Sequence, residues 1–412
     1  MKNRHKTPDF KYQVMCHNFI TPHRTIRALC RLLLLTCIAA QAGITPATAS
    51  ASGLSGDEHS PNFTPEPNPL LNSPYKPPAT IRHVTVNSLY QLNSELRNAN
   101  KNKGYVSLDI EDGTYQLGQT LNIRADHIIL RSKSGNPEKV ILQGSKTRNT
   151  GIPVLIKVFA KHFSIDSITL QNAKAHLIQI AGEHDADYPV IRNCVLQDSY
   201  QQLIKISYDK KKRAQISSDF GLIENSVFRY TEGIGPNYYI GGIDLHAGNS
   251  WIIRNNKFRD IASPSGSVAE HAIHAWTNSY NTIVENNIIE DCDRGIGFGL
   301  FTRRKHPSII FQHRGGLIRN NLILHNDNND PFADAGIILE DSANTLVENN
   351  GIWMAHDYPN AIEYRSPSTR NVVIKNNITN KKIISRNGAK AILLDNTVDA
   401  KREEIIAAHL YE

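Results

Sequence analysis

The sequence predicts an all-β protein, built as a single-stranded right-handed parallel β-helix of about 9–10 coils with an N-terminal capping helix. Two interleaved repeats of short strands and polar turns, with little helix between them, support this fold class. The first repeat is a pair of apolar residues, a charged or polar residue and then Asn, often doubled. Its first Asn returns every 27 to 34 residues, at positions 193, 225, 255, 286, 320, 349 and 376.

The second repeat lies between these copies and predicts a strand with one buried face, because apolar residues alternate with others over four or five positions. Isoleucine is the second residue of every copy, at Ile178, Ile204, Ile243, Ile273, Ile296, Ile337 and Ile362. One coil cannot bury such a face alone, but stacked coils share a core. The repeated Asn fits a ladder of turns, because Asn tolerates left-handed geometry and its amide can bond the next coil.

The chain begins with a segment that predicts export. Residues 1–49 are expected to be a signal peptide, because Arg27 and Arg31 precede the apolar run Leu32–Ala40 and small residues follow it. Cys37 raises the alternative of a lipoprotein, which the threonine before it disfavours. No later run approaches the ~18 apolar residues of a transmembrane helix. We therefore expect a secreted or periplasmic protein.

The rest of the chain divides by composition and periodicity. A stretch rich in Pro, Ser and Asn predicts a flexible linker ahead of the repeats. Apolar residues at helical spacing in Val86–Gly104 predict the helix that caps the open end of the β-helix. The expected parts after the signal peptide are the linker over 50–80, the β-helix over 81–398 and a C-terminal cap over 399–412.

The charge and the cysteine content argue against a nucleic-acid-binding protein and against a protein held together by disulfides. The formal net charge is +7, but without the leader 39 basic and 38 acidic residues remain, a net charge of +1. A near-neutral protein gives no argument for a nucleic-acid partner. Beyond the leader only Cys194 and Cys292 remain. They are expected three coils, or ~14 Å, apart, too far for a disulfide, so we expect two free buried thiols.

The second repeat also predicts which side chains point away from the core, because alternate residues of a strand face opposite sides. One outward column is Gln179, Lys205, Asp244, His274, Gly297, Ile338 and Glu363. The other is Ala181, Ser207, His246, Trp276, Gly299, Glu340 and Arg365. Coils stack at ~4.8 Å. One compact surface patch is therefore expected from Lys205, Asp244, His246, His274 and Trp276.

The surroundings of this patch favour a binding site over a merely solvated sheet face. Gly297 and Gly299 are expected to leave a flat bed of backbone beside it. Long insertions precede the strands of Asp244 and His274, and loops grouped at one point of a rigid scaffold are where binding surfaces are built. Two further loops are basic, the second of them containing Arg303 and Arg304. Together they suggest an anionic ligand.

The chain resembles the pectate-lyase-like β-helix superfamily over roughly residues 81–398. The resemblance rests on the pattern "GI-x-φ-x … ENN" and on the entry "SELRNANKNKG … LDIEDGTYQL". That superfamily includes pectate, alginate and chondroitin lyases, mannuronan C5-epimerases, pectin-type hydrolases and non-catalytic tailspike-like proteins. "DLH" at Asp244–His246 is similar to the Asp-Pro-His-Asp element of the epimerases. Leu245 and Ala247 depart from that element, so only Asp244 and His246 carry over.

The resemblance implies chemistry at a uronic acid. Lyases and epimerases both remove the proton next to the uronate carboxylate, which needs a base and a cation that stabilises the developing charge. The expected catalytic residues are Asp244, His246 and His274, with either histidine as the base. The expected substrate-binding residues are Lys205, His271, Trp276, Gly297, Gly299, Arg303, Arg304 and Arg365. The first function we expect is therefore a polysaccharide lyase acting by β-elimination on an acidic polysaccharide.

Three alternatives stay open. A C5-epimerase would use the same groups, and a non-catalytic carbohydrate-binding or envelope-structural β-helix would use none of them chemically. A hydrolase needs two carboxylates about 5–10 Å apart. Asp244 and Glu340 are expected ~14 Å apart, although Glu270 on a loop could complete a closer pair. Glu340 and Arg365, in adjacent coils of one column, are expected to form an ion pair.

Two metal sites are conceivable from the donor types. Asp327, Asp330 and Asp334 form an acid-rich loop that could bind Ca²⁺, although a turn cluster is the simpler interpretation. His246, His271 and His274 with Asp244 could instead hold a transition metal. We expect a monomer, and Ca²⁺ is the cofactor that we name as the candidate.

Overall fold

The computed structural model describes residues 76, 78–145, 151–211, 216–301, 309–326 and 330–409, all within a unit that spans 59–412. The predicted signal peptide lies outside the described residues, and so does the predicted linker apart from residues 76 and 78–80. Among the described residues, no helix is long and apolar enough to cross a membrane.

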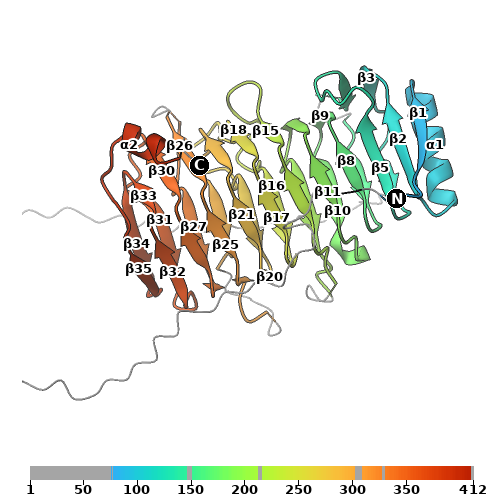
Figure 1. The fold of residues 1–412 in the computed structure, drawn as a ribbon. Helices are drawn as coiled ribbons and strands as arrows, with labels where there is room; N and C mark the ends of the chain where they lie inside the picture. Colours follow the sequence, from blue (N-terminus) through green and yellow to red (C-terminus); the bar gives the residue numbers. More distant parts are fainter. Residues whose placement is uncertain are drawn as a thin grey trace, which may run out of the picture. The chain divides into compact units, whose positions relative to one another are not determined.

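The unit is the predicted right-handed parallel β-helix, whose coils stack strand over strand along one axis (Figure 1). Three long parallel sheets run its length. The first, called the ladder sheet below, contains β1 (Arg82–Val86), β2 (Val106–Ile110), β5 (Ile128–Ser132), β8 (Ser164–Asp166), β11 (Val190–Arg192), β14 (Leu222–Glu224), β17 (Ile252–Arg254), β21 (Ile283–Glu285), β25 (Leu317–Arg319), β29 (Leu346–Glu348), β32 (Val372–Lys375) and β35 (Ala391–Leu394).

The second sheet, called the site sheet, carries the predicted functional columns. It contains β4 (Leu121–Ile123), β7 (Val154–Val158), β10 (His176–Ala181), β13 (Ile204–Ser207), β16 (Ile243–His246), β19 (Ile273–Trp276), β23 (Ile296–Phe298), β27 (Ile337–Glu340), β31 (Asn360–Arg365) and β34 (Lys382–Arg386). Its ten strands agree with the predicted number of coils.

The third sheet closes each coil, and a small fourth sheet lies in the turns. The third contains β3 (Gly113–Gln116), β6 (Val140–Gln143), β9 (Thr169–Ala173), β12 (Val195–Ser199), β15 (Val227–Arg229), β18 (Lys257–Arg259), β22 (Ile288–Glu290), β26 (Leu322–His325), β30 (Gly351–Met354) and β33 (Ile378–Thr379). The fourth contains β20 (Ser279–Tyr280), β24 (His313–Arg314) and β28 (Ser342–Ala343).

The structure confirms that the seven isoleucines stack in one column inside the core. Each isoleucine pairs in register with the next along the site sheet, from Ile178 with Ile204 to Ile337 with Ile362. All seven are buried with at most 1% of their surface exposed, within one continuous hydrophobic cluster. Cys194 and Cys292 are free and buried, as predicted, and burial raises the pKa of Cys194 to about 12.

The predicted asparagine ladder exists, but two residues divide the roles that the sequence assigned to one. The first Asn of every copy adopts the left-handed conformation, with φ between 51° and 56°. The second position forms the bonded ladder: the Asn256 amide donates to Asn287 at 3.0 Å, and Asn287 donates to Asn321 at 3.0 Å. These amides are buried and also donate to backbone carbonyls, so their hydrogen-bonding capacity is used inside the core.

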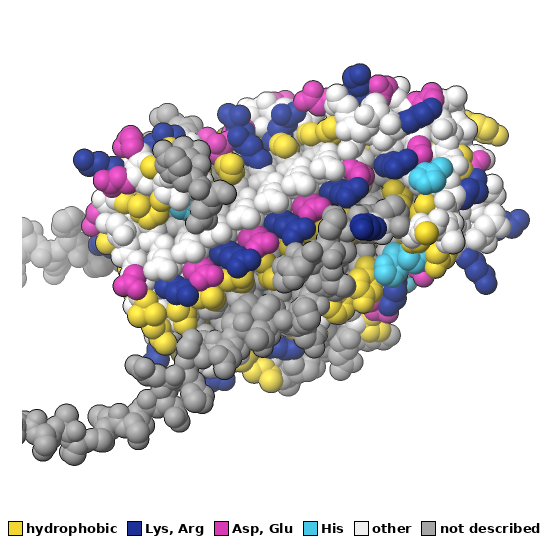
Figure 2. All heavy atoms as spheres, in the orientation of Figure 1, with side chains coloured by type: hydrophobic (Ala, Val, Ile, Leu, Met, Phe, Trp, Pro, Cys, Tyr) yellow, Lys and Arg dark blue, Asp and Glu magenta, His cyan; other side chains and the backbone are white. Residues whose placement is uncertain are grey.

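A second ladder, made of charges, runs along the ladder sheet and was not predicted. Its members, called the charge ladder below, are Asp109, Arg131, Asp166, Arg192, Glu224, Arg254, Glu285, Arg319, Glu348 and Lys375. Figure 2 shows them as a row of alternating dark blue and magenta side chains. Arg254 lies 2.9 Å from Glu224, and Lys375 lies 3.1 Å from Glu348. Alternating sign lets every charge face an opposite one in the next coil.

The two ends of the β-helix are finished differently. Helix α1 (Leu89–Lys101) covers the first coil and buries Leu92, Leu96 and Ala99 against it, as predicted (Figure 1). Helix α2 (Arg402–Ala407) lies within the predicted cap but packs on β30 through Ile405. The last strand, β35, therefore keeps its apolar residues about half exposed: Ile392, Leu393 and Leu394.

Candidate functional site

The two outward columns stack as the repeat predicts. Lys205 on β13 pairs with Asp244 on β16, which pairs with His274 on β19. In the neighbouring column His246 pairs with Trp276. The predicted patch is therefore one cluster drawn from three consecutive coils. We call Lys205, Asp244, His246, His271, His274 and Trp276 the candidate site.

Asp244 is the centre of this cluster. Its carboxylate forms an ion pair with the Lys205 ammonium and accepts a hydrogen bond from the Trp276 indole at 2.7 Å. Burial alone would raise its pKa, but the positive charge of Lys205 outweighs burial and holds the pKa of Asp244 well below its usual value. Asp244 is therefore a carboxylate at neutral pH and acts here as an acceptor and anchor.

His246 shares the same lysine. The Lys205 Nζ lies 2.6 Å from its Nε2, and Thr277 Oγ1 lies 2.9 Å from its Nδ1. An ammonium group only donates, so Nε2 accepts and the ring proton sits on Nδ1. Burial lowers the pKa of His246, which favours this neutral form. Tyr208 stacks on the ring at 5.0 Å between centroids. The lone pair of His246 Nε2 therefore accepts a hydrogen bond from the Lys205 ammonium.

The two glycines of the columns seat histidines rather than leaving bare backbone. A side chain on Gly297 would meet His271 Nε2 at 2.6 Å, so the His271 imidazole occupies that space. Gly299 has φ of +80°, and its carbonyl lies 3.0 Å from His274 Nε2. The expectation of an open glycine bed is therefore wrong, because the His271 ring fills the space at Gly297 and the backbone of Glu340 fills that at Gly299.

The site is also less open than a surface cleft. The exposed fractions are 7% for Asp244, 5% for His246, 4% for His271 and 3% for His274. Lys205 and Trp276 are partly exposed and form the accessible edge of the cluster.

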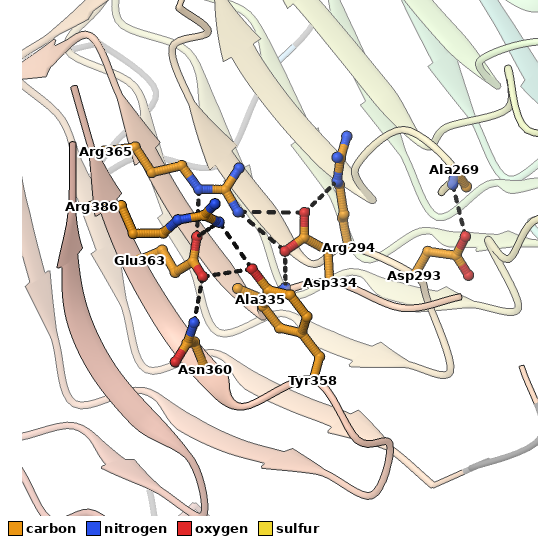
Figure 3. A network of polar contacts seen from close by, with 10 residues as sticks. All are labelled: Ala269, Asp293, Arg294, Asp334, Ala335, Tyr358, Asn360, Glu363, Arg365 and Arg386. Carbon is orange, nitrogen blue, oxygen red and sulfur yellow. Dashed lines mark hydrogen bonds and ion pairs between the residues drawn. The ribbon is translucent and has the colours of Figure 1, made fainter. Parts of the chain in front are cut away.

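Arg365 does not point into this cluster as a free cation. Figure 3 shows it in a separate network on β31, where it pairs with Glu363 and, at 3.1 Å, with Asp334. Asp334 also accepts from Arg294 at 3.2 Å, and Glu363 is fully buried. The expected ion pair of Arg365 with Glu340 is replaced by these contacts. The Arg365 guanidinium is thus committed to carboxylates of the chain itself.

The remaining predicted residues lie apart from the cluster or outside the described residues. Asp330 receives a contact from His325 Nε2 at 2.7 Å, whereas Asp334 belongs to the arginine network. Their carboxylates have different partners, and the Ca²⁺ site stays a prediction. The third member of that site, Asp327, and the two loop arginines, Arg303 and Arg304, lie outside the described residues.

Sequence reasoning did not assign Thr277 or Tyr208 to the site, or place Glu270 beside His271 and His274. Thr277 and Tyr208 each follow the last outward residue of a strand, so the column pattern could have been extended by one position. Glu270 and His271 lie ahead of β19, and nothing in the repeat indicates that this loop folds back over β23. That geometry depends on tertiary packing alone.

Comparison with solved structures shows what this chain is similar to. An alginate lyase from Paenibacillus sp. str. FPU-7 matches with a TM-score of 0.51 and 15% identity, over 77% of this chain and 99% of that chain. PfbA, a surface adhesin of Streptococcus pneumoniae, matches with a TM-score of 0.50 and 13% identity, over 76% and 87%. The chain is a right-handed parallel β-helix protein. No family model and no curated protein sequence matches it.

At such low identity the two matches show the fold of the β-helix and leave its activity open. One neighbour is described as an enzyme and the other as an adhesin, so the same fold serves both classes. Function has to be argued from the candidate site of this β-helix itself.

Proposed function

We propose that this β-helix protein is a secreted or periplasmic, carbohydrate-active protein, and specifically a polysaccharide lyase that cleaves a uronic-acid polymer by β-elimination. The observation that carries the proposal is the shared contact of Lys205 with Asp244 and with His246 Nε2. It joins a cation, its anchoring carboxylate and a neutral imidazole at the accessible edge of one cluster. The Paenibacillus neighbour, an alginate lyase, is consistent with this class of reaction.

The lysine links substrate binding to base activation. A uronate carboxylate that reaches Lys205 competes with His246 for the ammonium protons. When Lys205 turns to the carboxylate, the lone pair of His246 Nε2 becomes free to take the adjacent C5 proton. The electron pair of that C–H bond forms the C4–C5 double bond, and the C4–O bond breaks. The lysine charge stabilises the enolate-like intermediate.

Neighbouring side chains have supporting roles in this proposal. Asp244 holds the Lys205 ammonium in place through their ion pair, and Thr277 fixes the His246 tautomer through Nδ1. The partly exposed Trp276, held by Asp244 and stacked on His274 at 5.1 Å, offers a flat surface for a sugar ring. Tyr208, stacked on His246, is the residue we assign to protonate the leaving oxygen.

The test is absorbance near 235 nm during incubation with alginate, pectate and glycosaminoglycans, each with and without Ca²⁺. The unsaturated product of elimination absorbs at this wavelength. We expect a rise with at least one polymer, and a loss of about 10²–10⁴-fold in His246→Gln, the range typical of a removed general base. His356→Gln, a change at another buried histidine, is the matched control and should keep full activity.

A trace that stays flat on every polymer would contradict the lyase proposal for those substrates. Deuterium uptake at C5 without absorbance would then identify a C5-epimerase, which uses the same base and cation. The absence of both the absorbance rise and the deuterium uptake would favour the second candidate, a non-catalytic carbohydrate-binding protein. The near-complete burial of His246 and His274 supports that candidate, and so does the adhesin among the structural neighbours.

A further inference from the structure

Glu270, His271 and His274 bring one donor atom each to within 4.8 Å of one another at the start of β19. Two imidazoles and one carboxylate form a donor set that suits Zn²⁺ and similar divalent transition metals. The acid-rich loop predicted for Ca²⁺ offers a different, all-oxygen set, so these three residues are a separate candidate.

His271 is the member that most needs a ligand. It is 4% exposed, and among the described residues neither ring nitrogen has a hydrogen-bond partner. A buried polar atom left without a partner costs about 1–3 kcal/mol, so native proteins rarely tolerate two on one ring. Gly297 lacks the side chain that would collide with this imidazole. The fold therefore makes room for an imidazole whose two nitrogens have no hydrogen-bond partner in the described part of the chain.

His274 is oriented in the way that metal ligands commonly are. Its Nε2 lies 3.0 Å from the Gly299 carbonyl. A carbonyl only accepts, so Nε2 carries the proton and Nδ1 keeps its lone pair. A metal-binding histidine usually donates its other ring proton to a carbonyl or carboxylate, which fixes the tautomer and the ring plane. The ring of His274 lies 4.4 Å from the ring of His271.

The charges around the three residues allow a cation. Arg294 and Arg365 are the cationic groups that act on His271, but both are paired with Asp334, and Arg365 also with Glu363. The negative charge of the Asp244 carboxylate acts on both histidines.

We propose that Glu270, His271 and His274 form a binding site for a divalent transition-metal ion of the Zn²⁺ class. Ligand atoms around tetrahedral zinc lie about 3.4 Å apart, given metal–ligand bonds of about 2.1 Å. Binding therefore draws the donors together, and Glu270, which is only partly buried, supplies most of this movement. Three protein ligands leave a coordination position for water or for an oxygen of a bound ligand.

The site does not depend on the proposed function, so the experiment measures binding alone. The full chain is stripped with a chelator, dialysed and titrated with Zn²⁺ by calorimetry. Co²⁺ is added separately, and its visible spectrum reports the ligand geometry. We expect one equivalent of Zn²⁺ and a tetrahedral or five-coordinate Co²⁺ spectrum. In His271→Ala we expect the affinity to fall at least about 100-fold, because a direct ligand counts for more than an outer-sphere partner.

Two further variants keep the test decisive if His271→Ala fails to fold. Glu270→Gln changes a partly exposed side chain and removes the charged donor, and it should weaken Zn²⁺ in the same way. His356→Gln is the control, since its buried Nε2 also has no partner among the described residues, near His325. Unchanged binding in Glu270→Gln, loss of binding in His356→Gln, or no binding by the unaltered chain would each overturn the proposal.

Discussion

The charge ladder and the candidate site lie on different sheets of the same β-helix, and both are columns of ionisable side chains. In the charge ladder one residue per coil alternates in sign, and each cation meets a carboxylate of a neighbouring coil. In the candidate site a single carboxylate, Asp244, pairs with a lysine and accepts a hydrogen bond from an indole within three coils. The charge ladder repeats, whereas the site occurs once.

This difference separates two reasons for charges in a β-helix. An alternating column is explained by pairing between coils, and no ligand is needed to account for it. The candidate site mixes residue types, leaves His271 without partners among the described residues and places the Lys205 ammonium against His246 Nε2. Such departure from the local rule is expected where function constrains the sequence.

The largest effect on stability is expected at Asp244. Asp244→Asn keeps the shape and the acceptor for Trp276 but leaves the Lys205 ammonium beside His246 without its counter-charge. Breaking a buried ion pair in this way costs about 3 kcal/mol or more. Urea unfolding at pH 7.5 measures the change. A loss below about 1 kcal/mol would show that the site is as weakly coupled as the exposed part of the charge ladder.

The second-largest effect is expected in how the free energy of unfolding depends on pH, through His176 near the candidate site. Burial lowers the pKa of His176 to about 4, against 6.5 for an ordinary histidine. Between these values the unfolded chain binds the proton and the folded chain does not, so stability falls as the pH drops from 6.5 to 4. One such group changes the free energy of unfolding by up to about 1.4 kcal/mol per pH unit.

The pH effect is isolated by substitution. His176→Gln should give a shallower fall in unfolding free energy over this range than the unaltered chain, by about 3 kcal/mol at pH 4. Unfolding curves at pH 7.5, 5.5 and 4 supply the comparison. Identical pH profiles for the two chains would mean that burial does not lower the pKa of His176 in the folded state.

The smallest effect is expected in the charge ladder. The side chain of Lys375 is 37% exposed, and its partner Glu348 also has Arg319 as its register neighbour in the preceding coil. Lys375→Met should therefore change stability by no more than about 1 kcal/mol, and less in high salt. Thermal unfolding at low and high ionic strength measures both. A loss as large as that of Asp244→Asn would erase the contrast between the two columns.

Most of the fold follows from periodicity in the sequence. The isoleucine repeat has period two within a strand and one copy per coil, so it predicts both the buried face and the register. The charge ladder was equally visible, because the residue before each first Asn alternates between Glu and Arg or Lys from Arg192 to Lys375. It was not predicted, because the prediction of strands and turns used only the apolar and Asn positions of the repeat.

The site could be predicted in position but not in exposure. The columns place Lys205, Asp244 and His246 together, because register alone fixes which residues are neighbours. Burial depends on loops whose path no repeat encodes. The imidazole of His271 over Gly297 is the clearest case, since a loop residue occupies space that the repeat leaves to a glycine. Arg365 illustrates the same limit, because its partner Asp334 lies outside any strand.

The contacts of Asp244 reach from β13 through β16 to β19, and this has an evolutionary consequence. Gene duplication multiplies coils, yet no single coil contains the candidate site. A coil inserted between β13 and β16 would keep the isoleucine core and the asparagine ladder continuous, but would move Lys205 a further ~4.8 Å from Asp244. Lineages can therefore lengthen this β-helix near its ends at little cost, while the three central coils must be inherited as one block.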